Sequence, residues 1–279
     1  MASALLALAA SVAWGLGDFA GGLISRRLPV ASVTLLQHAA GLATVVVIAV
    51  ALRAELSRQA VAVGALGGVF SAGGILSYYR ALSIGTMSIV SPLAACGAVV
   101  TVAASLADGE RPSAMSLTGG VVALSGAVLA SFHEHGRGGA SREAVLLALV
   151  TAFMFGMQLY FLGRASDEGG PISAILGARV VSAGVIALLV WGLWRRRVHF
   201  SHPGFVAGIV GTGVLVATAN ALYGLAAERG LISIASVLAS LYPVTTVLLA
   251  YLALRERLNR TQVVGVVVAL TGVTITVLG

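Results

Sequence analysis

Long apolar runs separated by short polar turns make up almost the whole chain. A helix needs about 20 mainly apolar residues to cross a hydrocarbon core roughly 30 Å thick. Ten runs approach or exceed that length: Leu5–Ile24, Ser32–Leu52, Val61–Leu82, Thr86–Ala107, Ala114–Phe132, Ala144–Gly163, Ile172–Trp194, Gly204–Ala227, Leu231–Leu254 and Thr261–Leu278. Because these runs are continuous and do not alternate polar with apolar residues, they predict transmembrane helices and not the strands of a membrane barrel.

Motifs along these runs occur twice. Glu110-Arg111 returns 146 residues later as Glu256-Arg257, and Trp14-Gly15 returns 141 residues later as Phe155-Gly156. Offsets that stay nearly constant along the chain indicate an internal duplication.

The duplication divides the chain into three parts. We predict a first five-helix repeat at residues 1–132, a polar, glycine-rich linker at 133–143 and a second five-helix repeat at 144–279. Because five is odd, the second repeat enters the membrane from the opposite face. The predicted fold class is an all-α integral membrane protein with ten transmembrane helices arranged as two inverted five-helix repeats, an architecture common among transporters.

Composition agrees with a membrane protein. Hydrophobic residues make up 58% of the sequence and charged residues 10%, and the mean hydropathy is +1.01, which excludes a water-soluble surface. The net charge of +7 comes from arginines that lie mostly in the turns, where they set membrane topology and do not indicate nucleic-acid binding. We expect a multi-pass protein of a cell membrane.

Three ionisable residues lie well inside predicted helices: Asp18, His38 and Arg179. A charge at that depth costs at least about 2.5–3.5 kcal/mol, so each one is a candidate functional residue. Asp18 and His38 lie equally far from the turn that joins their helices and can pair if their helix faces meet. Arg179 is the repeat partner of His38 and lies near the opposite face. Asp18 would bind a proton or an ammonium group, Arg179 would bind a carboxylate, and His38 would tune the proton affinity of Asp18. The alternative is a buried structural cluster in which the three neutralise one another.

Further polar and aromatic residues are expected to line a cavity around these three. The candidates are Trp14, Gln37, Tyr78, Gln158, Tyr160, Asn220 and Tyr223, with Tyr242 as a further possibility. Taken singly, each aromatic residue is equally compatible with ordinary packing or with an anchor at the membrane interface.

The sequence has no phosphate-binding loop, His-Glu-x-x-His or Gly-x-Ser-x-Gly signature. We therefore predict no catalytic residue, no metal site and no cofactor, and the protein is not expected to be an enzyme. An intramembrane enzyme would need a nucleophile or a metal set near Asp18 and His38.

The motifs described above resemble those of a known family. The chain is similar to the EamA-like, ten-helix branch of the drug/metabolite transporter superfamily. The residues that carry the resemblance are Trp14-Gly15, Tyr79-Arg80-Ala81-Leu82, Phe155-Gly156, Arg179, and Pro243 followed by Glu256-Arg257. His38 stands where an arginine is usual in this family, and Gly97 stands where Pro243 lies in the second repeat, so the two halves of the site are not charge-symmetric.

The resemblance implies export or exchange of amino acids, other small metabolites or drug-like compounds, driven by a proton or another coupling ion. Zwitterions are among the expected substrates, and the lipid bilayer is the surrounding partner. The alternative function is a lipid-handling or scramblase-like protein, which would carry polar residues on a lipid-facing surface. The excess of arginines in the turns after odd-numbered helices predicts that both chain ends lie outside the cell, whereas the family resemblance implies ends inside.

Overall fold

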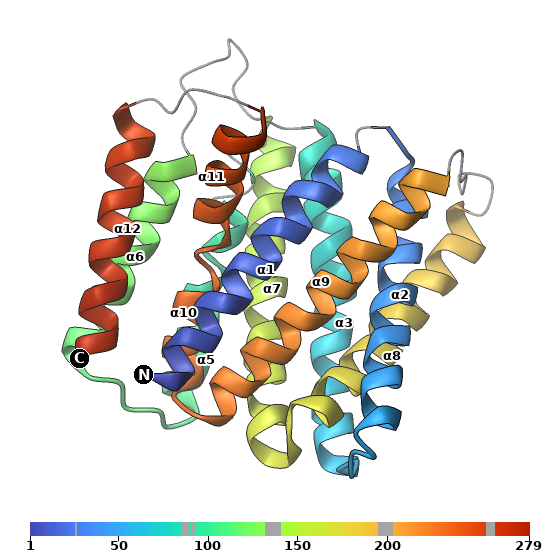
Figure 1. Cartoon of the computed structure of the whole chain (residues 1–279), viewed down its shortest axis with the longest axis horizontal. Coiled ribbons are helices and arrows are strands. Elements are labelled where there is room, and N and C mark those ends of the chain that lie inside the picture. Colours follow the sequence, from blue (N-terminus) through green and yellow to red (C-terminus); the bar gives the residue numbers. More distant parts are fainter. Residues whose placement is uncertain (26, 85–89, 91–92, 132–140, 195–202, 255–259) are drawn as a thin grey trace.

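The computed structural model describes residues 1–279 except 26, 85–89, 91–92, 132–140, 195–202 and 255–259. Every regular element in the described residues is a helix. The helices are α1 (Ala2–Ser25), α2 (Val30–Ala51), α3 (Arg58–Ile84), α5 (Gly97–Ala107), α6 (Ala114–Ser131), α7 (Arg142–Gly169), α8 (Pro171–Leu189) with its π-helical extension η1 (Val190–Trp194), α9 (Pro203–Glu228), α10 (Ile232–Ala239), α11 (Tyr242–Leu254) and α12 (Arg260–Leu278). They stand side by side in a bundle (Figure 1).

Seven of these helices are long and apolar enough to cross a membrane: α1, α2, α3, α7, α8, α9 and α12. Three shorter apolar helices lie at Leu93–Ala107, Ala114–Leu129 and Ile232–Thr245. The all-helical membrane fold is thus confirmed, and each of the ten predicted spans contains helix. Part of the predicted fourth span and most of the predicted linker lie outside the described residues, and α7 begins at Arg142, two residues before the predicted boundary.

Local sequence explains where the helices start and stop. Ser141 caps α7, because its hydroxyl accepts a hydrogen bond from the backbone N–H of Ala144 at 3.1 Å. Gly170, with a φ of 81°, ends α7. Pro171 begins α8, where its lack of an N–H group costs no hydrogen bond because the first N–H groups of a helix have no partner within it. Pro243 lacks an N–H and lies in the first turn of α11, which accounts for the break between α10 and α11.

Both chain ends lie at the same face of the bundle, called here the termini face (Figure 1). Helices α7 and α9 end at this face, and α1, α8 and α10 begin there. Helix α1 packs on α9, and α3 packs on α7 and α8. Helices α6 and α12 form a close pair at one end of the molecule (Figure 1).

Glycines permit the closest of these crossings. A Cβ atom added at Gly126 would lie 2.2 Å from the backbone N of Ala269, and one added at Gly272 would lie 2.2 Å from the backbone N of Ala123. Such contacts are far below van der Waals separation, so only glycine fits where α6 crosses α12. This is the expected use of small residues in a bilayer, where lipid supplies no hydrophobic force between helices.

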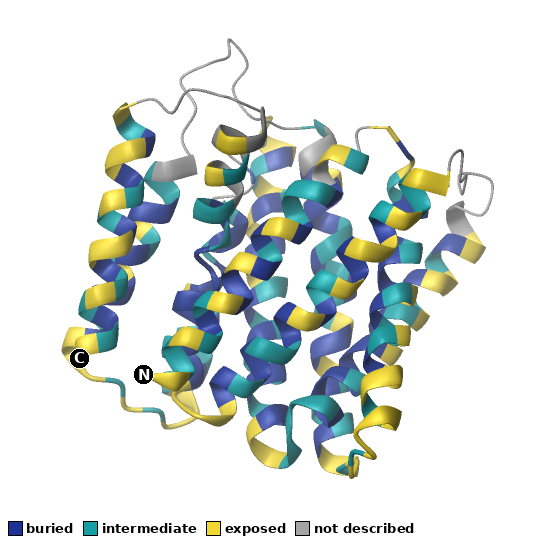
Figure 2. Cartoon of the chain, in the orientation of Figure 1, coloured by how far each residue is buried: buried dark blue, intermediate teal, exposed yellow. Residues whose placement is uncertain are grey.

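Exposed positions line the outside of the bundle (Figure 2), and many of them carry large apolar side chains. Val47, Leu188, Trp191 and Val267 are all more than half exposed. A water-soluble protein rarely exposes apolar surface on this scale, so these side chains face lipid. Gln37, His38, Arg179 and Asn220, by contrast, are buried.

Candidate functional site

A cavity of about 100 Å³, counted as space open to the centre of a water molecule, lies in the middle of the bundle. It is lined by Trp14, Asp18, Gln37, His38, Ser71, Ile75, Ala94, Ala95, Gly97, Ala98, Phe155, Gln158, Leu159, Arg179, Val216, Asn220, Ser240 and Tyr242. The lining comes from α1, α2, α3, α5, α7, α8, α9 and the segment around the α10–α11 break. Since about 10–15 Å³ of such space is the least that holds one water, the cavity has room for several water-sized groups.

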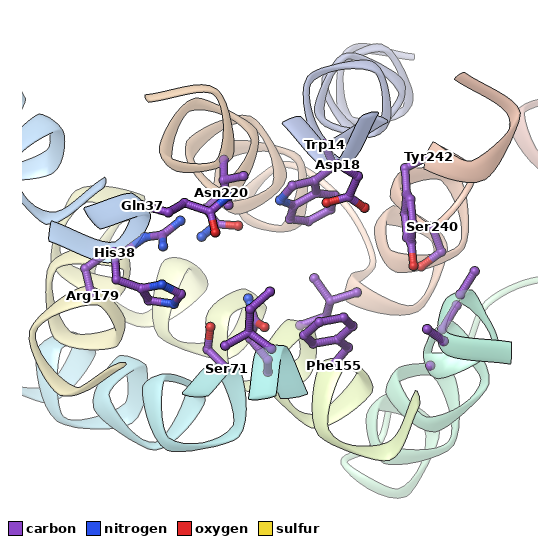
Figure 3. A pocket seen from close by; sticks show the side chains of 18 residues that line it. Trp14, Asp18, Gln37, His38, Ser71, Phe155, Arg179, Asn220, Ser240 and Tyr242 are labelled. Atoms are coloured by element: carbon purple, nitrogen blue, oxygen red, sulfur yellow. The ribbon is translucent and has the colours of Figure 1, made fainter. Parts of the chain in front are cut away.

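One end of the cavity is basic and rich in amides (Figure 3). Arg179 is only 3% exposed, yet within the described structure its Nε and Nη2 atoms have no hydrogen-bond partner. Burying a guanidinium without a partner costs several kcal/mol of stability, and a bound anion would offset this cost. Gly41 of α2 makes room for it, since a Cβ atom added there would lie 3.3 Å from the guanidinium carbon.

His38 and the amides complete this end. The Nδ1 atom of His38 lies 3.0 Å from the backbone oxygen of Thr34. Because a carbonyl oxygen only accepts, Nδ1 carries the proton, and Nε2 of the neutral ring is an acceptor. The amide of Gln37 donates to the hydroxyl of Thr212 at 3.4 Å. Asn220 is 4% exposed, and its Oδ1 atom has no hydrogen-bond partner among the described residues.

The other end holds Asp18, with Ser240 and Tyr242 beside it (Figure 3). Asp18 projects from the last third of α1. In the part of the chain that the structure describes, its carboxylate forms no hydrogen bond and no ion pair. Asp18 and His38, which could pair only if their helix faces met, form no ion pair in the described structure. Helix α9 packs against both α1 and α2, and His38 lies at the arginine end (Figure 3).

Aromatic and aliphatic side chains form the walls between the two ends. Trp14 and Phe155 lie on opposite walls (Figure 3). Trp14 rests on Tyr223, with ring centroids 6.0 Å apart. Leu159, Ile75 and Val216 add aliphatic surface. A ligand that fills the cavity would meet apolar groups along its middle and polar groups at its ends.

Seven of the ten predicted site residues line the cavity: Trp14, Asp18, Gln37, His38, Gln158, Arg179 and Asn220. The three tyrosines do not. Tyr78 packs on Phe155 with a centroid distance of 5.8 Å, and Tyr160 packs on Phe161 at 5.3 Å. Tyr223 is fully buried one turn below Asn220, where its hydroxyl donates to the backbone oxygen of Leu159 at 2.9 Å.

Ser71 and Ser240 line the cavity but were not predicted. The signal that could have found them is the repeat. Ser71 is 145 residues before Val216, and Ser240 is 146 residues after Ala94, and all four residues line the cavity. The same offsets relate other lining residues of the two halves.

The fold and the cavity define a multi-pass helical membrane protein with a polar chamber in its interior. Comparisons with known proteins agree. The sequence model of the EamA-like transporter family matches residues 1–132 and 142–278. The chain belongs to this family, which confirms the resemblance seen in the sequence and places it with the drug/metabolite transporters. Members of this family are transporters and not enzymes, which implies a small-molecule substrate and a membrane location.

Two further similarities bear on the architecture. An uncharacterized protein of Methanocaldococcus jannaschii, MJ1333.1, is 27% identical over 130 residues, which is 47% of this chain and 93% of that protein. That protein is therefore about as long as one half of this chain. A solved crystal structure has the same fold, with a TM-score of 0.81 at 20% identity, covering 99% of this chain and 96% of that one.

Proposed function

We propose that this protein is a secondary-active transporter, an exporter or exchanger, that moves small zwitterionic metabolites, amino acids or related drug-like compounds across the bacterial cytoplasmic membrane. The observation that carries the proposal is a cavity at mid-depth with an unpartnered guanidinium at one end and an unpaired carboxylate at the other. Asp18 binds the ammonium group or a coupling proton, Arg179 binds the carboxylate, and His38 offers an acceptor beside Arg179.

The proposed mechanism is alternating access by two inverted five-helix repeats, residues 1–132 and 144–279. Six pairs of lining residues support this arrangement because each pair is related by the repeat offsets. They are Trp14 with Phe155, Asp18 with Leu159, His38 with Arg179, Ser71 with Val216, Ile75 with Asn220, and Ala94 with Ser240. Packing of α1 on α9 likewise has its repeat counterpart in packing of α7 on α3.

Contacts on the termini face support a state that is closed toward that face. Large buried side chains, including Leu162, Ile175 and Leu238, fill the space between the cavity and the termini face. A structure closed on one side and hollow in the middle is what alternating access requires of one of its two states.

Polar contacts between the halves reinforce this closure. We call them the termini-face latch, formed by Gln59, Asp108, Glu110, Arg164, Glu168 and the first turn of α10. The carboxylate of Glu110 accepts from the backbone N–H groups of Ile232 at 2.6 Å and Ser233 at 3.0 Å. Arg164 bridges Asp108 at 3.1 Å and Glu168 at 3.3 Å, and Gln59 donates to Glu168 at 3.2 Å.

The lipid-handling alternative expects polar residues on a lipid-facing surface. At mid-depth, Gln37, His38, Arg179 and Asn220 are instead all buried and line the cavity. This placement favours a small solute over a lipid.

Transport by the purified protein in lipid vesicles tests the proposal. A counterflow screen of amino acids and organic cations identifies a substrate. We expect Asp18→Asn and Arg179→Ala each to lower its uptake at least about 10-fold, since each removes a charge-assisted hydrogen bond, and Asp18→Asn to abolish the response to a pH jump. Asp167→Asn makes the same chemical change at an exposed position and should leave uptake unchanged. Wild-type uptake and pH dependence in both cavity variants would refute the assigned roles, and lipid scrambling without solute counterflow would favour the alternative.

A further inference from the structure

The two charged groups of the cavity lie far apart, and this separation selects among zwitterions. Asp18 lies seven residues before the end of α1 at Ser25, and Arg179 lies eight residues after the start of α8 at Pro171. At 1.5 Å per residue, the two Cα atoms are about 10 Å and about 12 Å from opposite faces. In a hydrocarbon core roughly 30 Å thick, they therefore differ in depth by about 8 Å.

The two residues are also separated laterally. Helix α9 packs against both α1 and α8, whereas α1 and α8 do not pack closely on each other in the described residues, so their axes are more than one helix spacing of roughly 8–10 Å apart. Arg179 does not extend across this gap, because its guanidinium lies over Gly41 of α2. Figure 3 shows Asn220 and Trp14 between Arg179 and Asp18. The distance between the carboxylate and the guanidinium is on the order of 10 Å.

An α-amino acid is too short to use both ends well. Its ammonium nitrogen and carboxylate carbon are roughly 2.5 Å apart, the C–O bond adds roughly 1.2 Å, and charge-assisted hydrogen bonds add roughly 2.8 Å at each end, which gives about 9 Å in total. Even in a straight line, which the bent N–C–C backbone does not permit, this falls short of the separation. Each methylene inserted between the two groups adds about 1.3 Å, so four- and five-carbon ω-amino acids have their charges roughly 5–6 Å apart.

Size and wall chemistry agree with such a ligand. Four- and five-carbon ω-amino acids are small molecules of about 7–8 non-hydrogen atoms, compatible with a cavity that has room for several water-sized groups. Their methylenes would pass between Trp14 and Phe155, and the unpartnered amide oxygen of Asn220 offers a further acceptor along the way.

From this geometry we infer that the preferred substrates are zwitterions whose ammonium and carboxylate groups lie several bonds apart, as in ω-amino acids, with the carboxylate on Arg179 and the ammonium on Asp18. The inference rests on the proposed transport function and adds to it the length and the orientation of the substrate.

Calorimetric binding to the purified protein tests the inference with glycine, β-alanine, 4-aminobutanoate, 5-aminopentanoate and 6-aminohexanoate. We expect affinity to be highest for the four- or five-carbon compound, about 10- to 100-fold above glycine, the effect of one additional charge-assisted hydrogen bond. Pentanoate and pentylamine serve as ligands that lack one charge. Asp18→Asn should reduce the affinity for 5-aminopentanoate to that for pentanoate, and Arg179→Gln should reduce it to that for pentylamine.

A second variant separates ligand recognition from folding. Asp18→Glu moves the carboxylate about one methylene further into the cavity, so the optimal ligand should become one carbon shorter. A residue that serves only the structure would not shift this optimum. Asp167→Asn should leave the whole series unchanged.

The outcomes distinguish a failure of the inferred substrate length from a failure of the proposed function. If glycine or another α-amino acid binds best while Asp18→Asn and Arg179→Gln still weaken its binding, the length inference is overturned and the proposed function stands. If neither variant alters the binding or transport of any zwitterion, the proposed site itself is overturned.

Discussion

Replacing Glu110 with glutamine should open the termini face more often. The Glu110 carboxylate belongs to the first half of the chain and accepts two backbone N–H groups at the start of α10, in the second half. Hydrogen bonds to a charged group contribute about 1.5–3 kcal/mol each, and an anion at a helix N-terminus contributes a further 0.3–1 kcal/mol or so. Glutamine keeps one neutral acceptor and turns an N–H group toward the other donor.

Because Glu110 is half-buried and solvent screens part of the interaction, we take the loss as about 1–2 kcal/mol, or roughly 5- to 30-fold in the equilibrium between closed and open states. The assay is the rate of maleimide labelling at Ser236→Cys in a Cys96→Ala background. Ser236 lies on α10, one turn from the cavity residue Ser240 toward the termini face, and is fully buried. When opening is fast compared with labelling, the rate follows the open population.

Two controls isolate the effect of the latch. Glu228→Gln makes the same chemical change at an exposed position of the same face and should leave the rate unchanged. Labelling at Asp167→Cys, an exposed position of the same face, should not change with Glu110→Gln, because it is accessible in both states. A change of less than twofold at Ser236→Cys, or an equal rise with Glu228→Gln, would show that Glu110 does not hold this face closed.

Three further outcomes follow from the same structure. Gly126→Val should lower the thermal midpoint of the protein by several degrees or prevent folding, because a side chain there meets backbone at the α6–α12 crossing. Gly211→Ala, at a position with open space around it, should be tolerated, and thermal unfolding in detergent measures both variants. Gly41→Ala should push the guanidinium of Arg179 by a few tenths of an ångström and weaken binding of a carboxylate ligand such as pentanoate severalfold, with pentylamine unaffected, as measured by calorimetry. The arginine distribution predicts that the C-terminus lies outside the cell. Alkaline phosphatase fused to the C-terminus should therefore be active, and a reporter that fluoresces only in the cytoplasm should be dark when fused there.

The sequence was sufficient to locate the helices and the ionisable residues that line the cavity. In the described residues each apolar run of near-membrane length contains helix, since a backbone in lipid has to satisfy its hydrogen bonds internally. Asp18, His38 and Arg179 were found because ionisable groups at mid-depth are too costly to be common, and all three line the cavity.

The face and depth of other side chains could not be predicted. In a soluble helix the polar stripe marks the outside, but here lipid and protein interior are both apolar, so periodicity carries little information. Asn220 and Tyr223 share a helix face, yet one turn of depth places Asn220 in the cavity and Tyr223 beneath it. Ser71 and Ser240 were missed because serines also serve helix packing in membranes.

The distribution of charge over the repeat-matched positions supports the proposal that the cavity binds a zwitterion. An arginine at position 38, matching Arg179, would put a second permanent positive charge into the interior, and an aspartate at 159, matching Asp18, would add a second negative one. With His38 neutral and Leu159 apolar, the described lining carries one fixed positive and one ionisable negative group. A zwitterion aligned with them pairs both charges and leaves none uncompensated, whereas an anion or a cation alone would leave one buried charge unpaired at a cost of several kcal/mol. In the proposed mechanism, equivalent backbones would let the two halves exchange conformations, and unequal side chains at equivalent positions would fix the direction in which the substrate lies.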